Sequence, residues 1–319
     1  MLAAFLRLGR LKFLAGGLAG GALGTFAAAA DGRGIRWADY ALAQATISAF
    51  HLMTQYANDY FDRHADVHAR PTPYSGGSGV LVAGALPPGA ALGTALACAA
   101  AGALGATALA TVAGRPLAAA LAVAIALLAW AYSAPPLRLL ARGLGECDTA
   151  LVVAILVPLC AFAAQRGAPT ALAVAVTLPG ACAMLAMMLA VEYPDLRADA
   201  RAGKRNLVVR LGAEGAKPLG LGFAAAAYVA TGAALLAGAP PAFAFLQCVT
   251  LPVAAGYARA LRERPPDDPA ADEALAARGV AFFFLVVTAG ALAFAAGPET
   301  FARVPPSPTA STTAGLGSR

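Results

Sequence analysis

Acidic side chains occur in two short groups whose spacing suits metal binding. The first group lies in the segment NDYFDRHAD, where Asn58, Asp62 and Asp66 follow one another at intervals of four residues. If this segment is helical, the interval places the three side chains along one face. Asp59 lies three and seven residues before the two aspartates and could join the same edge. Carboxylate and amide oxygens are hard donors of the kind that Mg²⁺ prefers.

The second group lies in VEYPDLRADARAGKRNLVVRLG, where Asp195 and Asp199 are again four residues apart. Basic side chains stand among and just after these acids, at Arg197, Arg201, Lys204 and Arg205. Acids that hold a metal and bases that pair with phosphate oxygens, within one segment, are typical of a diphosphate-binding site.

Both groups adjoin apolar segments, where charge is costly. A carboxylate at the centre of a bilayer costs about 2.5–3.5 kcal/mol, and like charges on one helical face repel one another unless a cation lies among them. A solvated loop whose charges merely end a helix is the alternative for either group alone. Two such groups on the same side of the membrane favour a metal site.

Membrane helices are the elements that must position these groups. Apolar residues make up 60% of the chain, charged residues 13%, and the mean hydropathy is +0.68, whereas soluble domains carry about 25% charged residues. Runs of about 20 apolar residues span a hydrocarbon core of about 30 Å. The sequence therefore predicts an all-α integral membrane bundle of about nine helices rather than a soluble helical protein. The predicted spans are 13–30, 37–57, 90–112, 116–132, 150–164, 170–190, 218–237, 239–258 and 279–296.

The basic residues are distributed unequally across this predicted topology. With the N-terminus in the cytoplasm, 17 of the 23 Lys and Arg residues fall on the cytoplasmic side, as the positive-inside rule requires. Both acidic groups then lie on the cytoplasmic side of the membrane, which we expect to be a bacterial-type inner membrane. The sequence pI near 9.3 is explained by this topology. Nucleic-acid binding is not indicated, because no basic stretch is interleaved with aromatic residues.

Nothing in the sequence divides the chain into separate domains. We expect one transmembrane domain over residues 1–303 and a disordered tail over 304–319, which is rich in Pro, Ser, Thr and Gly. The five cysteines are scattered and form no CxxC pair, so neither a zinc ribbon nor a disulfide framework is indicated. His64 and His68 are four residues apart but lack an evident third ligand, which makes a zinc site unfavoured.

The acidic motifs resemble those of the UbiA superfamily of membrane prenyltransferases. NDYFDRHAD matches the NxxxDxxxD motif of that superfamily, and DLRADARAGK resembles its second motif, DxxxD followed by Gly-Lys. GGSGVLVAG (76–84) and YSAPPLRLLARGLGE (132–146) are most similar to the MenA-type 1,4-dihydroxy-2-naphthoate polyprenyltransferases. This chain departs from many relatives at Val191, where they have Asn, and at Asn206, where they have Thr. Glu192 would replace that Asn only from a direction rotated by about 100°.

The resemblance implies a Mg²⁺-dependent transfer of a polyprenyl group from an isoprenoid diphosphate to an aromatic acceptor. The acceptor would be dihydroxynaphthoate, in menaquinone biosynthesis, and its ring would lose its carboxyl group as the prenyl chain is attached. Two Mg²⁺ ions would be held by Asn58, Asp62, Asp66, Asp195 and Asp199, and the four aspartates would be the catalytic residues. The substrates would be bound by Lys204, Arg138, Arg63, Tyr132 and Ser133.

Several alternatives stay open at this point. The acceptor could instead be 4-hydroxybenzoate, homogentisate, a chlorophyll precursor or a glyceryl phosphate lipid. A cation-coupled transporter would place acids in the middle of helices, whereas Asp39 alone lies near the start of a predicted span. A structural scaffold gives no reason for paired aspartate motifs. Gly76, Gly77 and Gly79 could shape a loop over phosphate or simply allow a turn. The sequence does not fix the length of the donor chain or the oligomeric state.

Overall fold

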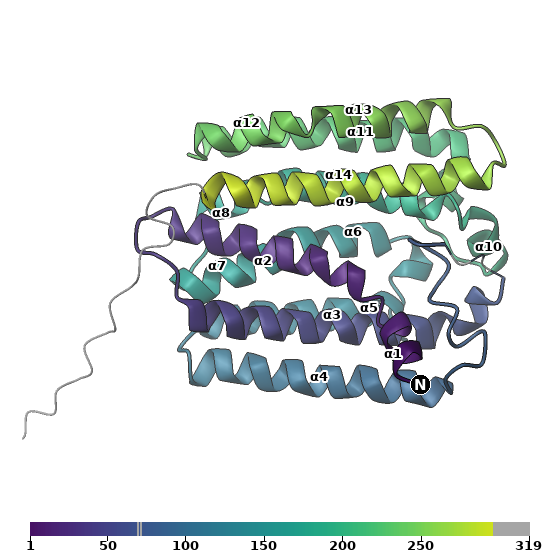
Figure 1. The fold of residues 1–319 in the computed structure, drawn as a ribbon, viewed down its shortest axis with the longest axis horizontal. Coiled ribbons are helices and arrows are strands. Elements are labelled where there is room, and N and C mark those ends of the chain that lie inside the picture. The colour runs from purple at the N-terminus through teal and green to yellow at the C-terminus, as the bar shows by residue number, and fades with distance from the viewer. Residues whose placement is uncertain (69, 71, 296–319) are drawn as a thin grey trace, which may run out of the picture.

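Helices make up all the regular secondary structure in residues 1–68, 70 and 72–295, the part of the chain that the computed structural model describes (Figure 1). The predicted disordered tail and the last residue of the ninth predicted span lie outside this part. The helices are α1 (Leu2–Leu8), α2 (Leu14–Ala29), α3 (Trp37–Asp66), α4 (Pro88–Thr111), α5 (Pro116–Ser133), α6 (Gly145–Thr149), α7 (Val157–Arg166), α8 (Ala171–Ala175), α9 (Leu178–Glu192), α10 (Leu196–Arg201), α11 (Leu207–Leu236), α12 (Pro241–Val249), α13 (Leu251–Glu263) and α14 (Pro269–Ala295). A π-helix, η3 (Ala150–Leu156), joins α6 to α7 in one continuous segment.

Seven helical segments of the described chain are long and apolar enough to cross a membrane, and the pair α12–α13, bent by 42°, makes eight. The protein is therefore an all-α integral membrane protein, as the composition predicts. The expected number of nine is not confirmed. The missing member is α3, which covers the predicted span 37–57 but is not among the segments that meet this test. The fifth predicted span, 150–164, is longer than expected and runs over Gly145–Arg166.

The helices lie roughly along one direction (Figure 1), with α11, α12 and α13 at one edge and α4 at the other. One apolar core joins α2, α9, α11, α13 and α14. A second core joins α3, α4 and α5. Side chains of α7 belong to both cores, which makes the bundle one packed body. Large apolar side chains such as Leu236, Val229 and Leu104 are exposed, as expected of surfaces that face lipid.

Glycines on α2 allow it to pack closely on two neighbours. Gly20 and Gly24 face the η3–α7 segment, Gly17 and Gly21 face α3, and Gly16 lies nearest to Phe283 and Phe284 of α14. Small residues four apart are the usual means by which membrane helices approach one another. The closest approach is at Gly24, where an added Cβ would lie 1.9 Å from the carbonyl oxygen of Pro158.

Gly24→Ala should therefore destabilise the bundle. The new methyl group meets backbone atoms that cannot rotate away, and overpacking of this kind costs roughly 1–3 kcal/mol or more. The measurement is thermal unfolding of the protein in detergent. The matched control is Gly222→Ala on α11, because a Cβ there meets nothing within 4 Å and the exchange is neutral or slightly stabilising. Equal melting temperatures for the two variants would contradict the predicted contact.

The two acidic motifs meet at one end of the bundle. The first occupies the last turns of α3, and the second lies between the end of α9 and α10. In Figure 1 this is the right-hand end, where α1 and α10 also lie. Segments about 130 residues apart in the sequence are thus neighbours in space, since the Lys204 ammonium lies 3.4 Å from Asp62.

Candidate active site

The first acidic motif lies on the extension of α3 beyond the predicted span. The helix continues without a break to Asp66, as the four-residue spacing of the motif predicts. The side chain of Asn58 forms hydrogen bonds with three other residues. Its amide nitrogen donates to the carboxylate of Asp62 (3.1 Å) and to the hydroxyl of Ser133 (2.9 Å), and its carbonyl oxygen accepts from Arg10 (2.8 Å). The side chain of Asn58 is thus fixed between α3, α5 and the N-terminal segment.

Asp59 has a contact set of its own. It forms an ion pair with Arg10 (2.9 Å) and accepts hydrogen bonds from the backbone N–H (3.3 Å) and the hydroxyl of Ser78. Its side chain is buried, so these partners replace the water that an exposed carboxylate would bind. Asp59 therefore ties the N-terminal segment and the glycine-rich loop to α3.

The glycine-rich loop also contacts both acidic motifs. The backbone N–H of Gly76 donates to the Asp195 carboxylate (2.9 Å), and an added Cβ on Gly77 would lie 2.2 Å from the Asp66 carboxylate. Gly76, Gly77 and Gly79 have φ between 70° and 76°, a region that favours glycine. Of the two roles left open by the sequence, turn formation is seen directly, and the turn lies against the acids.

In the second motif, Asp195 stands at the N-cap of α10 and Asp199 lies within it. One carboxylate oxygen of Asp195 accepts from Gly76, while the other is buried without a partner in the described part of the chain. Asp199 accepts from the amide of Asn206 (2.8 Å). The Asn at position 206, a departure from many relatives, thus supports the second motif directly.

Lys204 lies between the two motifs. Its ammonium is 3.4 Å from the carboxylate of Asp62 and 3.2 Å from that of Asp199. Burial by itself lowers the pKa of Lys204, but the two aspartates outweigh burial and raise that pKa above its ordinary value. Within the described residues, no three His, Cys, Asp or Glu side chains come together as a ready metal site. The cation that links the two motifs here is the Lys204 side chain.

The tightly grouped acids hold protons more strongly than isolated carboxyls do. Burial, aided by the charge of Asp62, raises the pKa of Asp66 to about 7. Burial, aided by Asp199, raises the pKa of Asp195 to about 6. Oxygen ligands bind a divalent cation in their ionised form, so an arriving cation must displace these protons.

Divalent-cation affinity should therefore fall as the pH falls from about 8 to about 5.5, through the raised pKa values of Asp66 and Asp195. We expect a loss of roughly tenfold or more. The measurement is calorimetric titration of the detergent-solubilised protein with Mn²⁺ at the two pH values. Asp66→Asn should reduce the pH dependence because it removes one of the protons. A cation affinity that is equal at both pH values would contradict the prediction.

The connection between α13 and α14 packs against Tyr193, which lies just before the second motif. Arg264 lies over the ring of Tyr193, with 4.7 Å from its guanidinium carbon to the ring centre, and it pairs with Asp272. The Tyr193 hydroxyl donates to the carbonyl of Ala213 (2.8 Å). Since Tyr193 is two residues before Asp195, these contacts fix the backbone from which the motif begins.

Val191 and Glu192, the positions of the departure noted in the sequence, point in different directions. Val191 lines a cavity in the bundle. Glu192 is buried next to Glu146, whose carboxylate accepts from the backbone N–H of Leu207 at the start of α11 (2.5 Å). Glu192 is not among the residues that line the cavity.

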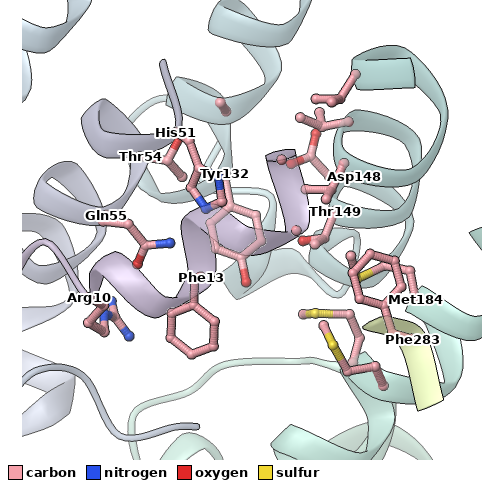
Figure 2. A pocket seen from close by; sticks show the side chains of 18 of the residues that line it. Arg10, Phe13, His51, Thr54, Gln55, Tyr132, Asp148, Thr149, Met184 and Phe283 are labelled. Carbon is pink, nitrogen blue, oxygen red and sulfur yellow. The ribbon is translucent and has the colours of Figure 1, made fainter. Parts of the chain in front are cut away.

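This cavity has a volume of about 240 Å³, and Figure 2 shows side chains that line it, including those of Arg10 and Tyr132. Residues of α2, α3, α5, η3, α9 and α14 surround it. Most are apolar, including Met184 and Phe283. Asn58 and Tyr132 also line it, and Asn58 contacts Asp62. Asn58 therefore belongs both to the acidic site and to the lining of the cavity.

The other residues predicted from the sequence lie apart from this centre. Arg63 turns back on its own helix, donates to the carbonyl of Tyr60 (2.6 Å) and covers its ring. Arg138 is exposed, with φ of 46° in the loop after α5. His64 and His68 are both exposed.

Two residues of the site were not predicted from the sequence. Arg10, in the link between α1 and α2, contacts Asn58 and Asp59 and lines the cavity. In the sequence it is one of several basic residues before the first span, where the positive-inside rule accounts for it. Asp148 lines the cavity from α6. The only sequence signal for it is a carboxylate at the start of a long apolar run.

Comparison with known proteins identifies a family and several structural neighbours. A model of the UbiA prenyltransferase family matches residues 18–286. No curated protein matches the chain. Among solved structures, a digeranylgeranylglyceryl phosphate synthase has 15% identity and a TM-score of 0.66, covering 92% of this chain and 98% of its own. A UbiA homologue from Archaeoglobus fulgidus bound to DMAPP and Mg²⁺ has 17% identity and a TM-score of 0.65, covering 89% and 99%. A UbiA homologue from Aeropyrum pernix K1 has 18% identity and a TM-score of 0.59, covering 82% and 96%.

Proposed function

Because the chain belongs to the UbiA prenyltransferase family, we propose that it transfers a polyprenyl group from an isoprenoid diphosphate to an aromatic acceptor, with Mg²⁺ as the cofactor. The observation that carries this proposal is that two aspartate motifs meet at one end of the bundle with Lys204 between them, and that Asn58 of the first motif also lines an apolar cavity. Acids and a base in contact suit a metal-bound diphosphate, and the cavity suits an apolar chain.

The donor atoms of the site fit Mg²⁺. Asp62, Asp66, Asp195 and Asp199 offer carboxylate oxygens, and one oxygen of Asp195 is buried without a partner among the residues that the structure describes. Mg²⁺ is commonly held by a few carboxylates together with substrate phosphates. We propose that these four residues hold two Mg²⁺ ions, with Asn58 nearby as a further ligand. Bound Mg²⁺ supplies positive charge where the leaving diphosphate accumulates negative charge. The A. fulgidus homologue bound to DMAPP and Mg²⁺ supports this assignment.

The basic residues divide into two groups by position. Lys204 and Arg10 lie at the acids, where they would pair with diphosphate oxygens once the carboxylates are occupied. Arg63 donates to its own helix and Arg138 is exposed, and both stay proposed contacts of the diphosphate. The prenyl chain would lie among the apolar side chains of the cavity, and Tyr132 and Ser133 would border the acceptor.

For the acceptor we propose 1,4-dihydroxy-2-naphthoate, which would place the reaction in menaquinone biosynthesis. The support is the similarity of segments 76–84 and 132–146 to the MenA-type branch. A glyceryl phosphate lipid is the second candidate, supported by the structural similarity to a digeranylgeranylglyceryl phosphate synthase. We also propose that residues 1–303 act as one domain with its acidic end in the cytoplasm, on the strength of the Lys and Arg asymmetry.

The proposal is tested by incubating purified protein with labelled geranylgeranyl diphosphate, Mg²⁺ and a panel of acceptors. The panel contains dihydroxynaphthoate, 4-hydroxybenzoate, homogentisate and a glyceryl phosphate lipid. Labelled, prenylated naphthoate is the expected product, and omission of Mg²⁺ should abolish it. A product with the lipid alone would move the chain to the second candidate. No product with any acceptor would overturn the proposal.

A further inference from the structure

Asp148 is a buried carboxylate that the proposed chemistry does not use. It is 7% exposed, and one of its carboxylate oxygens is fully buried with no hydrogen-bond partner in the described part of the chain. It lies in α6, and no ion pair to it is found among the described residues. A buried acceptor without a donor costs roughly 1–3 kcal/mol. A donor from outside the chain would remove this cost.

The carboxylate lies where a ligand can supply that donor. Asp148 lines the cavity, and among the described lining residues it is the one carboxylate. Figure 2 shows it beside Thr149 at the far side of the view from Arg10. The segment that follows is the π-helix η3, whose Val152 and Val153 line the cavity as well. Local π-helices are frequent at functional sites.

The charges around the cavity are arranged asymmetrically. Arg10, at one end, already pairs with Asp59 and Asn58. At the other end, Asp148 in its ionised form repels anions and accepts hydrogen bonds, because an ionised carboxylate has no hydrogen to donate. A ligand that carries both a hydroxyl group and an ionised carboxyl group would therefore enter with the hydroxyl towards Asp148 and the carboxyl group away from it.

We propose that Asp148 determines acceptor specificity by accepting a hydrogen bond from a ring hydroxyl of the aromatic acceptor. This inference rests on the proposed function, since it identifies the acceptor as a hydroxyarene and fixes its orientation. A site built around a hydroxyl group discriminates strongly against analogues that lack it, because the buried carboxylate is then left unpaired. The ring hydroxyl must be free, and an ether at that position cannot donate.

The experiment compares two probes, 4-hydroxy-2-naphthoate and its methyl ether, by calorimetric titration of the protein in detergent. The native protein should bind the hydroxy compound roughly 10- to 100-fold more tightly, as expected of a hydrogen bond to a charged group. Asp148→Asn keeps the shape of the side chain but loses the charge, so the preference should shrink several-fold. Asp148→Leu should remove the preference. The matched control, Glu263→Gln at an exposed acid, should retain it.

Cooperative thermal unfolding of each variant in detergent, measured without ligand, shows whether the variant is folded. A hydroxyl preference that persists in both Asp148 variants overturns the inference, as does a native protein with no preference. These results are separate from the transfer assay. A native protein that prefers the hydroxy probe through Asp148 but prenylates no acceptor would refute the proposed function and leave the hydroxyl site standing. Prenyl transfer with no effect of Asp148 on probe binding would do the reverse.

Discussion

Asp62→Asn should lower kcat/KM for prenyl transfer by roughly 10³-fold. Asp62 contacts both Asn58 of its own motif and Lys204 of the second, so it lies where the two halves of the proposed metal site meet. The exchange retains the shape of the side chain but removes a charge from the site. Loss of one partner from a buried charged group costs about 3–5 kcal/mol, and each 1.36 kcal/mol corresponds to a factor of about ten in rate.

The measurement is the initial rate of product formation at several Mg²⁺ concentrations. Because the defect lies in metal binding, higher Mg²⁺ should restore part of the rate. Glu214→Gln is the matched control, since this exposed acid pairs with Lys217 and is not among the residues that line the cavity, and it should keep full activity. Activity of Asp62→Asn within threefold of the native enzyme would show that the first motif does not hold the metal.

Lys204→Gln should have two effects with a common cause. The ammonium is the cation that lies between Asp62 and Asp199, and its raised pKa keeps it charged at neutral pH. Without it, the two carboxylates repel each other when no metal is bound. The melting temperature in the absence of Mg²⁺ should therefore fall by several degrees, and Mg²⁺ should restore more of it than in the native protein. The KM for the diphosphate donor should rise roughly 100-fold, because a charge-assisted contact to phosphate is lost.

Thermal unfolding with and without Mg²⁺ and donor saturation curves measure the two effects separately. Lys204→Arg keeps the charge and should recover most of the metal-free stability. Lys217→Gln is the matched control, because Lys217 pairs with Glu214 and not with the motifs. If Lys204→Gln changed neither the Mg²⁺-free melting temperature nor the donor KM, the internal ion pair would have no part in the site.

The sequence predicted the membrane bundle and the acidic motifs because both depend on short-range patterns. Apolar runs report helix length directly, and the interval between Asn58, Asp62 and Asp66 is the repeat of a helical face. Helix α3 is less apolar than the other long helices because it carries several polar residues, yet its packing against neighbouring helices keeps it in the bundle. The bend between α12 and α13, near Thr250 and Pro252, was likewise not predicted.

The contacts within the site could not be predicted from the sequence because they depend on tertiary packing. Lys204 was expected to bind phosphate, yet in this structure it pairs with carboxylates from two segments. Arg10 reaches Asn58 and Asp59 across 48 and 49 residues of sequence, and no spacing rule connects a single arginine to a distant motif. Asp148 gained its position from the path of α6 and η3 along the cavity, which composition does not encode.

The glycine stripe of α2 has a further consequence for how such an enzyme diversifies. Gly16 and Gly17 belong to the stripe that allows α2 to approach its neighbours, and both also line the cavity. The volume of the cavity at this wall thus depends on the lack of side chains at the two glycines. A single methyl group at Gly17 would press on His51 and shrink that room without touching any charged residue. A substitution at either glycine therefore changes the packing of α2 and the size of the cavity together, so helix packing and substrate range are altered by the same mutations.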